Sequence, residues 1–525
     1  MDLRIARARD MSVASVREAR EERRAAAGIS RRGLLGGAAA VAAATMLPRR
    51  ARANGGDPSV AIIGAGMAGM ACARLLDKRN VDFKVYEASA RIGGRMYTND
   101  SGYWSEGQIS EWGGELIDTG HRRMRKLASL YDLALDDLPT VSPSGAEEVY
   151  HVGGAYYPKP IADDDFAAMF DVVANDEALA GYPTTWDSYT SHGRMLDRMS
   201  VYDWIRTRVP GGHASPLGKV LDLAYAIEYG ADTTDQSALN LLYLLAYQPD
   251  ETVLSTFGES DERFHIRGGN QQLPKAIAAS LPGGTIEKGH QLVKLKKTSS
   301  GRTRCTFEVD GCSVDKTFDW VVLCLPFAVL ADVDLREADF DARKMQAIRD
   351  LGRGKSGKLQ LQFNTRAWRG TGPWPGVSNG STFADTGYQC SWEPTRGQSG
   401  TGGILNLFSG GSVTAAMRAT SAFGTAANAQ VRQDATAGLA QIGVVYPGLQ
   451  WNGRATQSIW HKAPFAKHGY AYYRVGQYTA FGGYEGARQG GVLFAGDHTS
   501  QDFQGFMEGA ATEGERAARD LLDLL

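Results

Sequence analysis

Cysteine is scarce in this sequence. The chain has five cysteines among its 525 residues, at positions 72, 305, 312, 324 and 390. A set this small and odd in number excludes a disulfide framework. Cys305 and Cys312 flank an Asp310-Gly311 hairpin turn, but pairing across that turn sets Val309 opposite Cys312 and leaves Cys305 farther along its strand. We therefore expect no bridge between these two cysteines.

Long apolar runs and internal repeats are also missing. The Ala/Gly/Val-rich run that ends at Leu47 has about 14 residues, too few for the roughly 20 that a membrane-spanning helix needs. Without repeats of fixed period, a repeat architecture is excluded as well. A soluble chain of 525 residues exceeds the size at which one hydrophobic core keeps growing, so we expect at least two domains.

Beyond residue 53 the sequence has no excess of basic residues. Residues 1–53 carry twelve Arg, no Lys and five acidic residues, whereas the remainder has 45 basic and 54 acidic residues and a net charge of −9. Such an acidic balance argues against nucleic acid as a partner.

The first 53 residues contain the parts of an export signal in the required order. Ser30-Arg31-Arg32-Gly33-Leu34-Leu35 precedes the short apolar run, and Ala51-Arg52-Ala53 supplies small residues for cleavage. This arrangement resembles a twin-arginine signal. We expect residues 1–53 to be a signal peptide, the Tat export machinery to be a partner, and the mature protein to be periplasmic or secreted.

Glycine, in contrast, is abundant, at 63 residues. Gly64-Ala65-Gly66-Met67-Ala68-Gly69 lies between an apolar run at 59–63 and a helical pattern at 67–79, and a second strand pattern ends at Glu87. In such a βαβ unit the first glycine permits the tight turn, the second admits a pyrophosphate, and the third packs helix on strand. Glu87 would accept hydrogen bonds from ribose hydroxyls. The motif predicts a dinucleotide site and leaves NAD and FAD open.

Other patterns indicate the remaining elements. The continuous apolar run at 320–326 predicts a central parallel strand. Leu359 to Phe363 alternates apolar residues with Gln, which predicts an antiparallel sheet with one wetter face. Residues 122–261 are mostly helical in pattern, and a strand and turn at 491–497 precede a helix from about Ala510.

The segment after Glu87 carries a family resemblance. Arg91-Ile92-Gly93-Gly94-Arg95-Met96-Tyr97-Thr98 resembles the R-x-G-G-R-x-x-T signature of the flavin amine oxidase family, which includes monoamine, polyamine and L-amino-acid oxidases. Segments 111–116, 267–270, 324–326, 494–499 and 505–510 extend the resemblance over most of the chain. It implies FAD rather than NAD. The FAD would be bound non-covalently, because Lys467-His468-Gly469 has no cysteine where some members attach the flavin.

The resemblance also implies the fold. We expect an α/β protein with a Rossmann-like FAD-binding domain of the two-dinucleotide-binding type and a second, α+β substrate-binding domain, both discontinuous in sequence. The FAD-binding domain would comprise residues 54–130, 262–345 and 466–525. The substrate-binding domain would comprise residues 131–261 and 346–465.

Residue roles follow from the same resemblance. Lys358, ten positions before Trp368 on a strand-like run, matches the lysine that holds a water at flavin N5 and is the expected catalytic residue; Lys355 is a nearby competitor. Tyr470, Phe506 and Trp392 are expected to line the substrate slot, and no metal site is expected. The expected FAD contacts are Gly64, Gly66, Met67, Ala68, Gly69, Glu87, Ala88, Gly94, Arg95, Gly114, Glu115, Val293, Trp460, Gly496, Asp497, Phe506 and Met507.

The implied reaction is oxidative deamination of an amine or L-amino acid. The imine would hydrolyse to an aldehyde or keto acid plus ammonia, with dioxygen reduced to hydrogen peroxide. The two substrate classes stay undivided: the loop at 113–116 has no Arg for a carboxylate, but Arg396 could supply one. The alternatives are a dehydrogenase or desaturase of the same fold with another electron acceptor, and a non-catalytic flavin-binding protein. A homodimer is left open.

Overall fold

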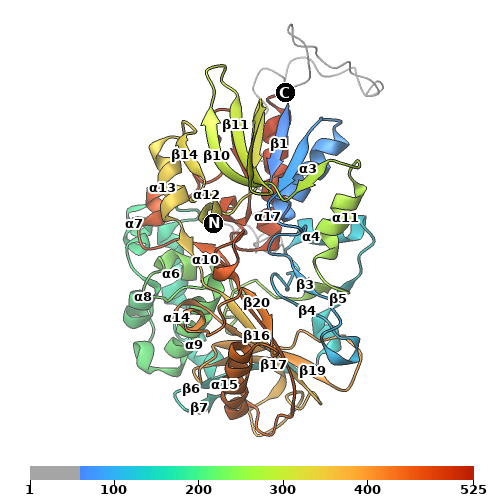
Figure 1. The fold of residues 1–525 in the computed structure, drawn as a ribbon. Coiled ribbons are helices and arrows are strands. Elements are labelled where there is room, and N and C mark those ends of the chain that lie inside the picture. Colours follow the sequence, from blue (N-terminus) through green and yellow to red (C-terminus); the bar gives the residue numbers. More distant parts are fainter. Residues whose placement is uncertain (1–58) are drawn as a thin grey trace, which may run out of the picture.

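A computed structural model describes residues 59–525, and the predicted signal peptide lies outside these residues. Figure 1 shows the nucleotide-binding elements in one half of the molecule and a large mixed sheet with its helices in the other. The two halves meet along the middle of the molecule.

The predicted βαβ unit forms the centre of a five-stranded parallel sheet. Its elements are β1 (Val60–Ile63), α3 (Met67–Lys78) and β2 (Lys84–Glu87). The strand order is β23-β13-β1-β2-β9, with β9 (Ile286–Lys288), β13 (Trp320–Leu323) and β23 (Val492–Phe494). β13 lies beside β1 with Trp320 opposite Val60, which confirms the central parallel strand predicted at 320–326.

The last helix packs against the first helix of this unit. α17 (Met507–Leu522) begins a few residues before the predicted start, and Figure 1 shows the red C-terminal helix next to the blue N-terminal elements. A Cβ on Gly514 would lie 2.1 Å from the carbonyl oxygen of Ala68. Only a glycine permits so close an approach of two backbones.

A four-stranded sheet covers part of the cofactor-binding half. It consists of β12 (Cys312–Phe318), β11 (Thr303–Val309), β10 (Gln291–Lys297) and β14 (Asp334–Glu337) in that order. The β11–β12 turn places Asp310 and Gly311 at φ 49° and 76°. Val309 pairs with Cys312 and Cys305 with Lys316, as the turn chemistry predicted, and all five cysteines are free.

The other half contains an eight-stranded mixed sheet. Its order is β20-β21-β16-β19-β18-β17-β6-β7. The strands are β6 (Ala146–Val152), β7 (Ala155–Tyr157), β16 (Gly357–Phe363), β17 (Val377–Ala384), β18 (Cys390–Trp392), β19 (Gly403–Ser409), β20 (Phe423–Thr425) and β21 (Trp451–Ile459). The β6–β7 hairpin is an exception within residues 122–261, which were predicted to be mostly helical and otherwise contain mainly helices.

β16 pairs antiparallel with β19 and β21, as predicted, but the prediction of a wetter face is wrong. Gln360 and Gln362 are 1% and 0% exposed. The segment that leads into β4 (Ser110–Glu111) covers this face and supplies polar partners: Ser110 Oγ donates to Gln360 Oε1 at 2.7 Å, and Gln362 Nε2 donates to the Ser105 carbonyl at 3.1 Å. The glutamines are thus buried because their amides are satisfied.

The remaining elements complete the two halves. The helices are α4 (Arg122–Leu130), α5 (Lys159–Ala167), α6 (Phe170–Ala180), α7 (Ser191–Asp197), α8 (Val201–Arg208), α9 (Pro216–Tyr229), α10 (Ala238–Leu245), α11 (Gln272–Ser280), α12 (Phe327–Leu330), α13 (Ala342–Asp350), α14 (Gly411–Ala415), α15 (Ala429–Val445) and α16 (Gln477–Phe481). Two-stranded pairs join β3 (Thr98–Asn99) to β4 (Ser110–Glu111), β5 (Leu135–Asp137) to β8 (Phe264–Ile266), and β15 (Gly352–Arg353) to β22 (Ala471–Tyr472). Within residues 59–525, no helix combines the length and the apolar character that crossing a membrane requires.

Candidate functional site

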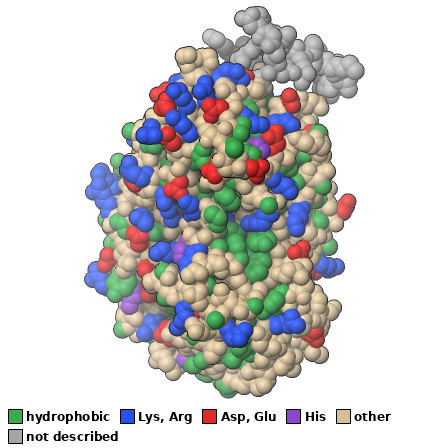
Figure 2. Space-filling view, viewed as in Figure 1, with side chains coloured by type: hydrophobic (Ala, Val, Ile, Leu, Met, Phe, Trp, Pro, Cys, Tyr) green, Lys and Arg blue, Asp and Glu red, His purple; other side chains and the backbone are tan. Residues whose placement is uncertain are grey.

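Two adjoining cavities lie where the halves of the molecule meet. The larger one has a volume of about 590 Å³ and the smaller one about 130 Å³. Figure 2 shows hydrophobic side chains gathered in a recess at the middle of one face, with Lys and Arg side chains near it. Both cavities are lined by Gly113, Gly114, Lys358, Phe408, Tyr470, Gly505, Phe506 and Met507. We call the larger one the cofactor cavity and the smaller one the substrate-side cavity.

The glycine turn after β1 forms one end of the cofactor cavity. Gly64 has φ +104°, and a Cβ there would lie 2.8 Å from the Cys324 carbonyl oxygen. A Cβ on Gly69 would lie 1.9 Å from the Gly64 carbonyl oxygen, whereas one on Gly66 would meet nothing closer than Gly94 Cα, at 3.8 Å. Gly64 and Gly69 are therefore required by the protein itself. Gly66 leaves open the space that a ligand would fill.

Most of the predicted FAD contacts line the cofactor cavity. They are Gly64, Gly66, Met67, Ala68, Glu87, Ala88, Gly94, Arg95, Gly114, Val293, Trp460, Gly496, Asp497, Phe506 and Met507. Gly69 and Glu115 do not line it: Gly69 is buried in the helix–strand contact, and Glu115 faces the substrate-side cavity. Of the predicted substrate residues, Tyr470 and Phe506 line both cavities and Trp392 lines the substrate-side cavity.

The polar groups of the cofactor cavity fit FAD. The N-terminus of α3 and Gly66 supply a site for the diphosphate, and Glu87 stands at the end of β2, where its Oε2 accepts from the Ala65 amide at 2.7 Å. Three buried polar atoms on the wall have no hydrogen-bond partner among the described residues. They are the two ring nitrogens of His498 and the hydroxyl oxygen of Ser356. Such groups are normally hydrogen-bonded, so a polar ligand would satisfy them.

Arg95 and Asp497 form an ion pair on the wall of this cavity. Arg95 Nη1 lies 3.1 Å from Asp497 Oδ2, the second guanidinium nitrogen contacts the other carboxylate oxygen, and Nη1 also donates to the Gly469 carbonyl at 2.7 Å. Although burial opposes it, the Arg95 charge holds the pKa of Asp497 below its ordinary value. Asp497 therefore orients the arginine on the wall of the cofactor cavity.

Lys358 projects from β16 to the boundary between the two cavities. It is 6% exposed. Its Nζ donates to Glu115 Oε2 at 2.6 Å, to the Gly113 carbonyl at 2.8 Å and, more weakly, to the Glu111 carbonyl at 3.4 Å. The neighbouring Lys355, the predicted competitor, lines neither cavity.

Glu115 connects Lys358 to Trp392. Its Oε1 accepts a hydrogen bond of 2.9 Å from Trp392 Nε1, so its two oxygens serve two different side chains. Burial opposes ionisation, but the charges of Lys358 and His265 lower the pKa of Glu115 below its ordinary value. The carboxylate of Glu115, a predicted FAD contact, is thus bonded to the lysine and the indole on the wall of the substrate-side cavity.

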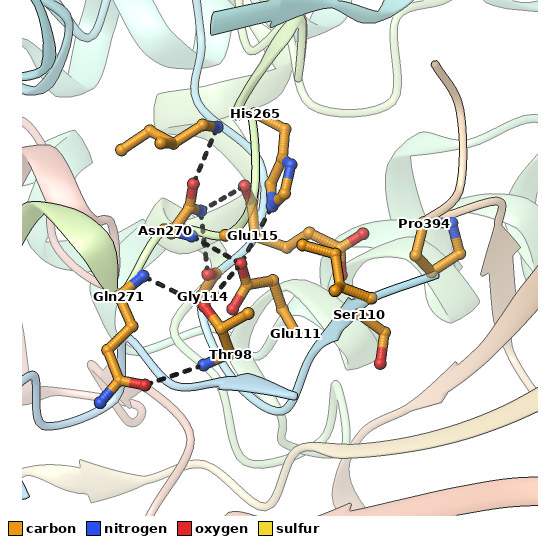
Figure 3. Close-up of polar contacts among 12 residues, drawn as sticks. Thr98, Ser110, Glu111, Gly114, Glu115, His265, Asn270, Gln271 and Pro394 are labelled. Carbon is orange, nitrogen blue, oxygen red and sulfur yellow. Dashed lines mark hydrogen bonds and ion pairs between the residues drawn. The ribbon is translucent and has the colours of Figure 1, made fainter. Parts of the chain in front are cut away.

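A buried carboxylate fixes the loop that carries Glu115. Figure 3 shows Glu111 receiving hydrogen bonds from three directions: Oε1 accepts from His265 Nε2 at 3.0 Å, from the Asn270 amide at 2.7 Å and from the Thr98 hydroxyl at 3.1 Å. Burial lowers the pKa of His265, but the bond to Glu111 outweighs it and raises that pKa. Asn270 Nδ2 in turn donates to the Glu115 carbonyl at 2.6 Å. The sequence did not reveal this role of Glu111.

Aromatic side chains form the walls near Lys358. The Phe506 ring lies 5.2 Å from that of His121, and Trp392 lies 5.3 Å from Phe408. Phe423 stands edge-on to Trp460 at 5.0 Å. Phe408 and Phe423 were not predicted, because a single aromatic residue in a strand pattern usually indicates ordinary core.

Carboxylates dominate the polar wall of the substrate-side cavity. Glu115, Glu148, Glu228 and Glu262 line it, and Lys358 is the only Lys or Arg among the described residues that do so. Glu148 accepts from the Tyr150 hydroxyl at 2.6 Å. Arg396, the candidate for a substrate carboxylate, lines neither cavity, and its Nε donates to the Glu393 carbonyl at 3.1 Å.

Glu228 is the least expected of these acids. It lies near the C-terminus of α9, a mostly apolar helix, where the helix dipole disfavours a negative charge. An acidic residue at the end of an apolar helix is a pattern from which the sequence could have predicted a functional carboxylate. Neither Glu228 nor Glu262 makes a side-chain hydrogen bond or ion pair within residues 59–525. Burial and the nearby Asp118 raise the pKa of Glu228 to about 8.

Comparisons with known proteins agree with this arrangement. The family model described as flavin containing amine oxidoreductase matches residues 67–522. The chain is similar to nicotine dehydrogenase of Pseudomonas putida, with 25% identity over 95% of this chain and 98% of that protein. It is also similar to L-amino acid dehydrogenase of Synechocystis, with 25% identity over 88% and 94%. Among solved structures, cyclohexylamine oxidase from Brevibacterium oxydans covers 89% of this chain and 100% of its own with a TM-score of 0.74 at 19% identity, which confirms the predicted fold class.

Proposed function

The chain belongs to the family of flavin-containing amine oxidoreductases, and from this premise we propose that it oxidises a small, positively charged amine without a carboxylate group. FAD supplies the hydride acceptor. The reacting nitrogen would first lose a proton to become neutral, and the carbon that bears it would then lose a hydride equivalent; water would hydrolyse the resulting imine to a carbonyl compound and ammonia. Membership of the family does not by itself determine the substrate preference, so the proposal concerns that preference.

The acidic wall of the substrate-side cavity carries this proposal. An L-amino acid needs a cationic partner for its carboxylate, yet the single Lys on the wall is bound to Glu115 at 2.6 Å. Glu228 and Glu262 instead offer carboxylates to an ammonium group. A buried charge is stable only when it is paired, so this wall favours a cation and disfavours a free amino acid.

The chain's own residues would then divide the work. Tyr470 and Phe506 border both cavities and would orient the amine between flat apolar surfaces. Glu228 would take the charge of an ammonium group. Lys358, at the boundary of the two cavities, would hold a proton near the reacting centre.

We propose that the FAD is held without a covalent bond. Segment 467–469 has no cysteine. Cys324 lines the cavity, but beside the glycine turn, where burial raises its thiol pKa to about 12 and removes its nucleophilic form. Acid precipitation should therefore release all of the flavin into the supernatant. Yellow colour that stays with the denatured protein would overturn this proposal.

We further propose export by the twin-arginine route and dioxygen as the electron acceptor. The signal proposal rests on the order of parts in residues 1–53. Replacing Arg31 and Arg32 by Lys should keep the protein in the cytoplasm with its flavin bound. Peroxide formation, measured against reduction of an artificial dye, tests the acceptor: turnover only with the dye would make the enzyme a dehydrogenase.

The substrate experiment uses the flavin as its own indicator. The purified chain from Asn54 onward is mixed anaerobically with primary amines, diamines, cyclic amines and L-amino acids, and the visible band is followed. We expect bleaching by one or more amines and none by the corresponding amino acids. Bleaching by L-amino acids alone would overturn the proposed substrate class.

A further inference from the structure

We infer that Glu115 is a positioning residue that holds Lys358 and Trp392 in a fixed arrangement at the boundary of the two cavities. This inference rests on the proposed function, since it assigns a role within the same site. The family resemblance placed Glu115 among the FAD contacts, whereas the structure shows its carboxylate in the substrate-side cavity.

The geometry forms a closed triangle. Lys358 Nζ lies 2.6 Å from Glu115 Oε2, Trp392 Nε1 lies 2.9 Å from Glu115 Oε1, and the Lys358 ammonium lies 5.4 Å from the Trp392 ring centroid. The three residues come from three segments: β16, the loop after β4, and β18. One carboxylate therefore links both halves of the molecule at this point.

The donors of Lys358 are largely committed by this contact. An ammonium group has three N–H donors, and Lys358 faces three protein acceptors, of which only the Glu111 carbonyl, at 3.4 Å, is a weak one. While Glu115 and the Gly113 carbonyl accept two of the ammonium N–H groups, the third N–H group is directed toward the cofactor cavity. Glu115 decides in which direction the free N–H points.

The same carboxylate shapes the substrate slot. Trp392 packs against Phe408 with ring centroids 5.3 Å apart, and both residues line the substrate-side cavity. Loss of the Glu115 bond would leave the indole N–H without its partner. The ring would then be free to turn, which widens the slot and weakens substrate binding.

Glutamine cannot replace this glutamate. Both partners of Glu115 are donors, and a carboxylate accepts with both oxygens, whereas a Gln amide has one acceptor and one donor. In Glu115→Gln one side chain, Lys358 or Trp392, would face an N–H group. Glu115→Asp keeps the charge and both acceptors on a shorter side chain, so it serves as the conservative variant.

A double-mutant cycle tests the inference. Glu115→Gln, Lys358→Met and the double variant are compared in the FAD-loaded enzyme, with flavin content as the check of folding. We expect each single change to lower kcat about tenfold and the double variant to be no slower than Lys358→Met, because residues that act as one unit are not additive. Losses that multiply to about a hundredfold would overturn the inference, since Glu115 would then act independently of the lysine.

Two further readouts separate positioning from general damage. Glu115→Gln should shift the pH dependence of kcat and the pH dependence of the oxidised flavin spectrum. Glu115→Asp should bring both partly back toward the wild type. Trp392→Phe removes the indole N–H together with part of the ring and should raise KM while leaving the pH profile unchanged. An oxidised-flavin spectrum that does not change in Glu115→Gln would contradict the inference about Glu115. A wild-type flavin that no amine reduces would instead contradict the proposed function.

Discussion

Arg95 and Asp497 lie 402 positions apart in the sequence and form an ion pair on the wall of the cofactor cavity. Asp497 Oδ2 and the Gly469 carbonyl both accept from the same guanidinium nitrogen. The first FAD signature and the last are therefore two parts of one contact, which sets the orientation of a positive charge beside the cofactor.

Removing the carboxylate of this pair should lower flavin retention. In Asp497→Asn the arginine, whose side chain is 23% exposed, keeps its charge and loses the buried carboxylate, so the cost should lie below the about 3–5 kcal/mol of a fully buried pair. We expect a lower ratio of flavin to protein absorbance after purification and a lower Tm. Asp334→Asn serves as the control, because Asp334 pairs with an exposed Arg336 and a surface pair contributes little. Equal losses in both variants would refute the role given to Asp497.

Alanine should have different effects at two glycines of the same turn. Gly66→Ala meets no protein atom within 3.8 Å, so the protein should fold with near-normal stability and lose FAD, because the added methyl occupies the ligand's space. Gly69→Ala would set a methyl 1.9 Å from a backbone oxygen and should lower the free energy of unfolding of the apoprotein. Chemical denaturation of the two apoproteins, with flavin titration, distinguishes these outcomes.

The raised pKa of Glu228 should give amine binding a pH dependence. Burial and Asp118 raise this pKa to about 8 from 4.5, so in the free enzyme the group gains its charge as the pH rises toward 8. The KM for an amine that stays protonated should therefore fall between pH 6 and 8, and Glu228→Gln should remove this dependence. A KM profile that is the same in the wild type and the variant would show that Glu228 does not contact the substrate.

The same pKa shift affects protein stability in the opposite direction. Ionisation of Glu228 should strengthen amine binding but should destabilise the substrate-free enzyme. A carboxyl group with a raised folded pKa contributes stability fully below its unfolded pKa of 4.5 and loses it as the pH rises through about 8. Glu228→Gln should therefore raise the Tm of the substrate-free enzyme at pH 8 and change it little at pH 4.5.

Buried histidines should make the enzyme sensitive to mild acid. Burial and the Arg95 charge lower the pKa of His468 to about 3, and burial lowers that of His498 to about 4, both from 6.5. Below pH 6.5 the unfolded chain gains protons that the folded chain does not, so stability falls by about 1.4 kcal/mol per pH unit for each histidine. His468→Asn should flatten the loss of Tm between pH 6.5 and 4.5.

The features that the sequence predicted are those decided by neighbouring residues. The turn at Gly64 and the hairpin at Asp310-Gly311 depend on backbone conformations that few residues allow, so the sequence names them directly. The β6–β7 hairpin carries a similar signal, since Gly153 and Gly154 separate the strands with φ 65° and 81°, but helical patterns dominate the residues that follow it.

Other features depend on what covers a residue, which the sequence does not state. Gln360 and Gln362 have the alternation of a solvated face, but a distant loop brings Ser105 and Ser110 over them. Glu228 and Phe408 reach the cavity from α9 and β19. No local pattern joins these elements, so only the tertiary structure could reveal the acidic wall.

The contact of Gly514 with Ala68 also bears on how the protein is made. The helix that begins at Met507 lies on the first helix of the nucleotide-binding unit, and Gly496, Asp497 and Met507 form part of the cofactor cavity wall. A nascent chain lacks this wall until the segment from Gly496 to Met507 has been synthesised, so the cavity cannot be complete before that point. A product truncated before Gly496 would have no complete cavity, and flavin absorbance in a purified sample would therefore report that synthesis had passed this segment and that the two distant segments had come together.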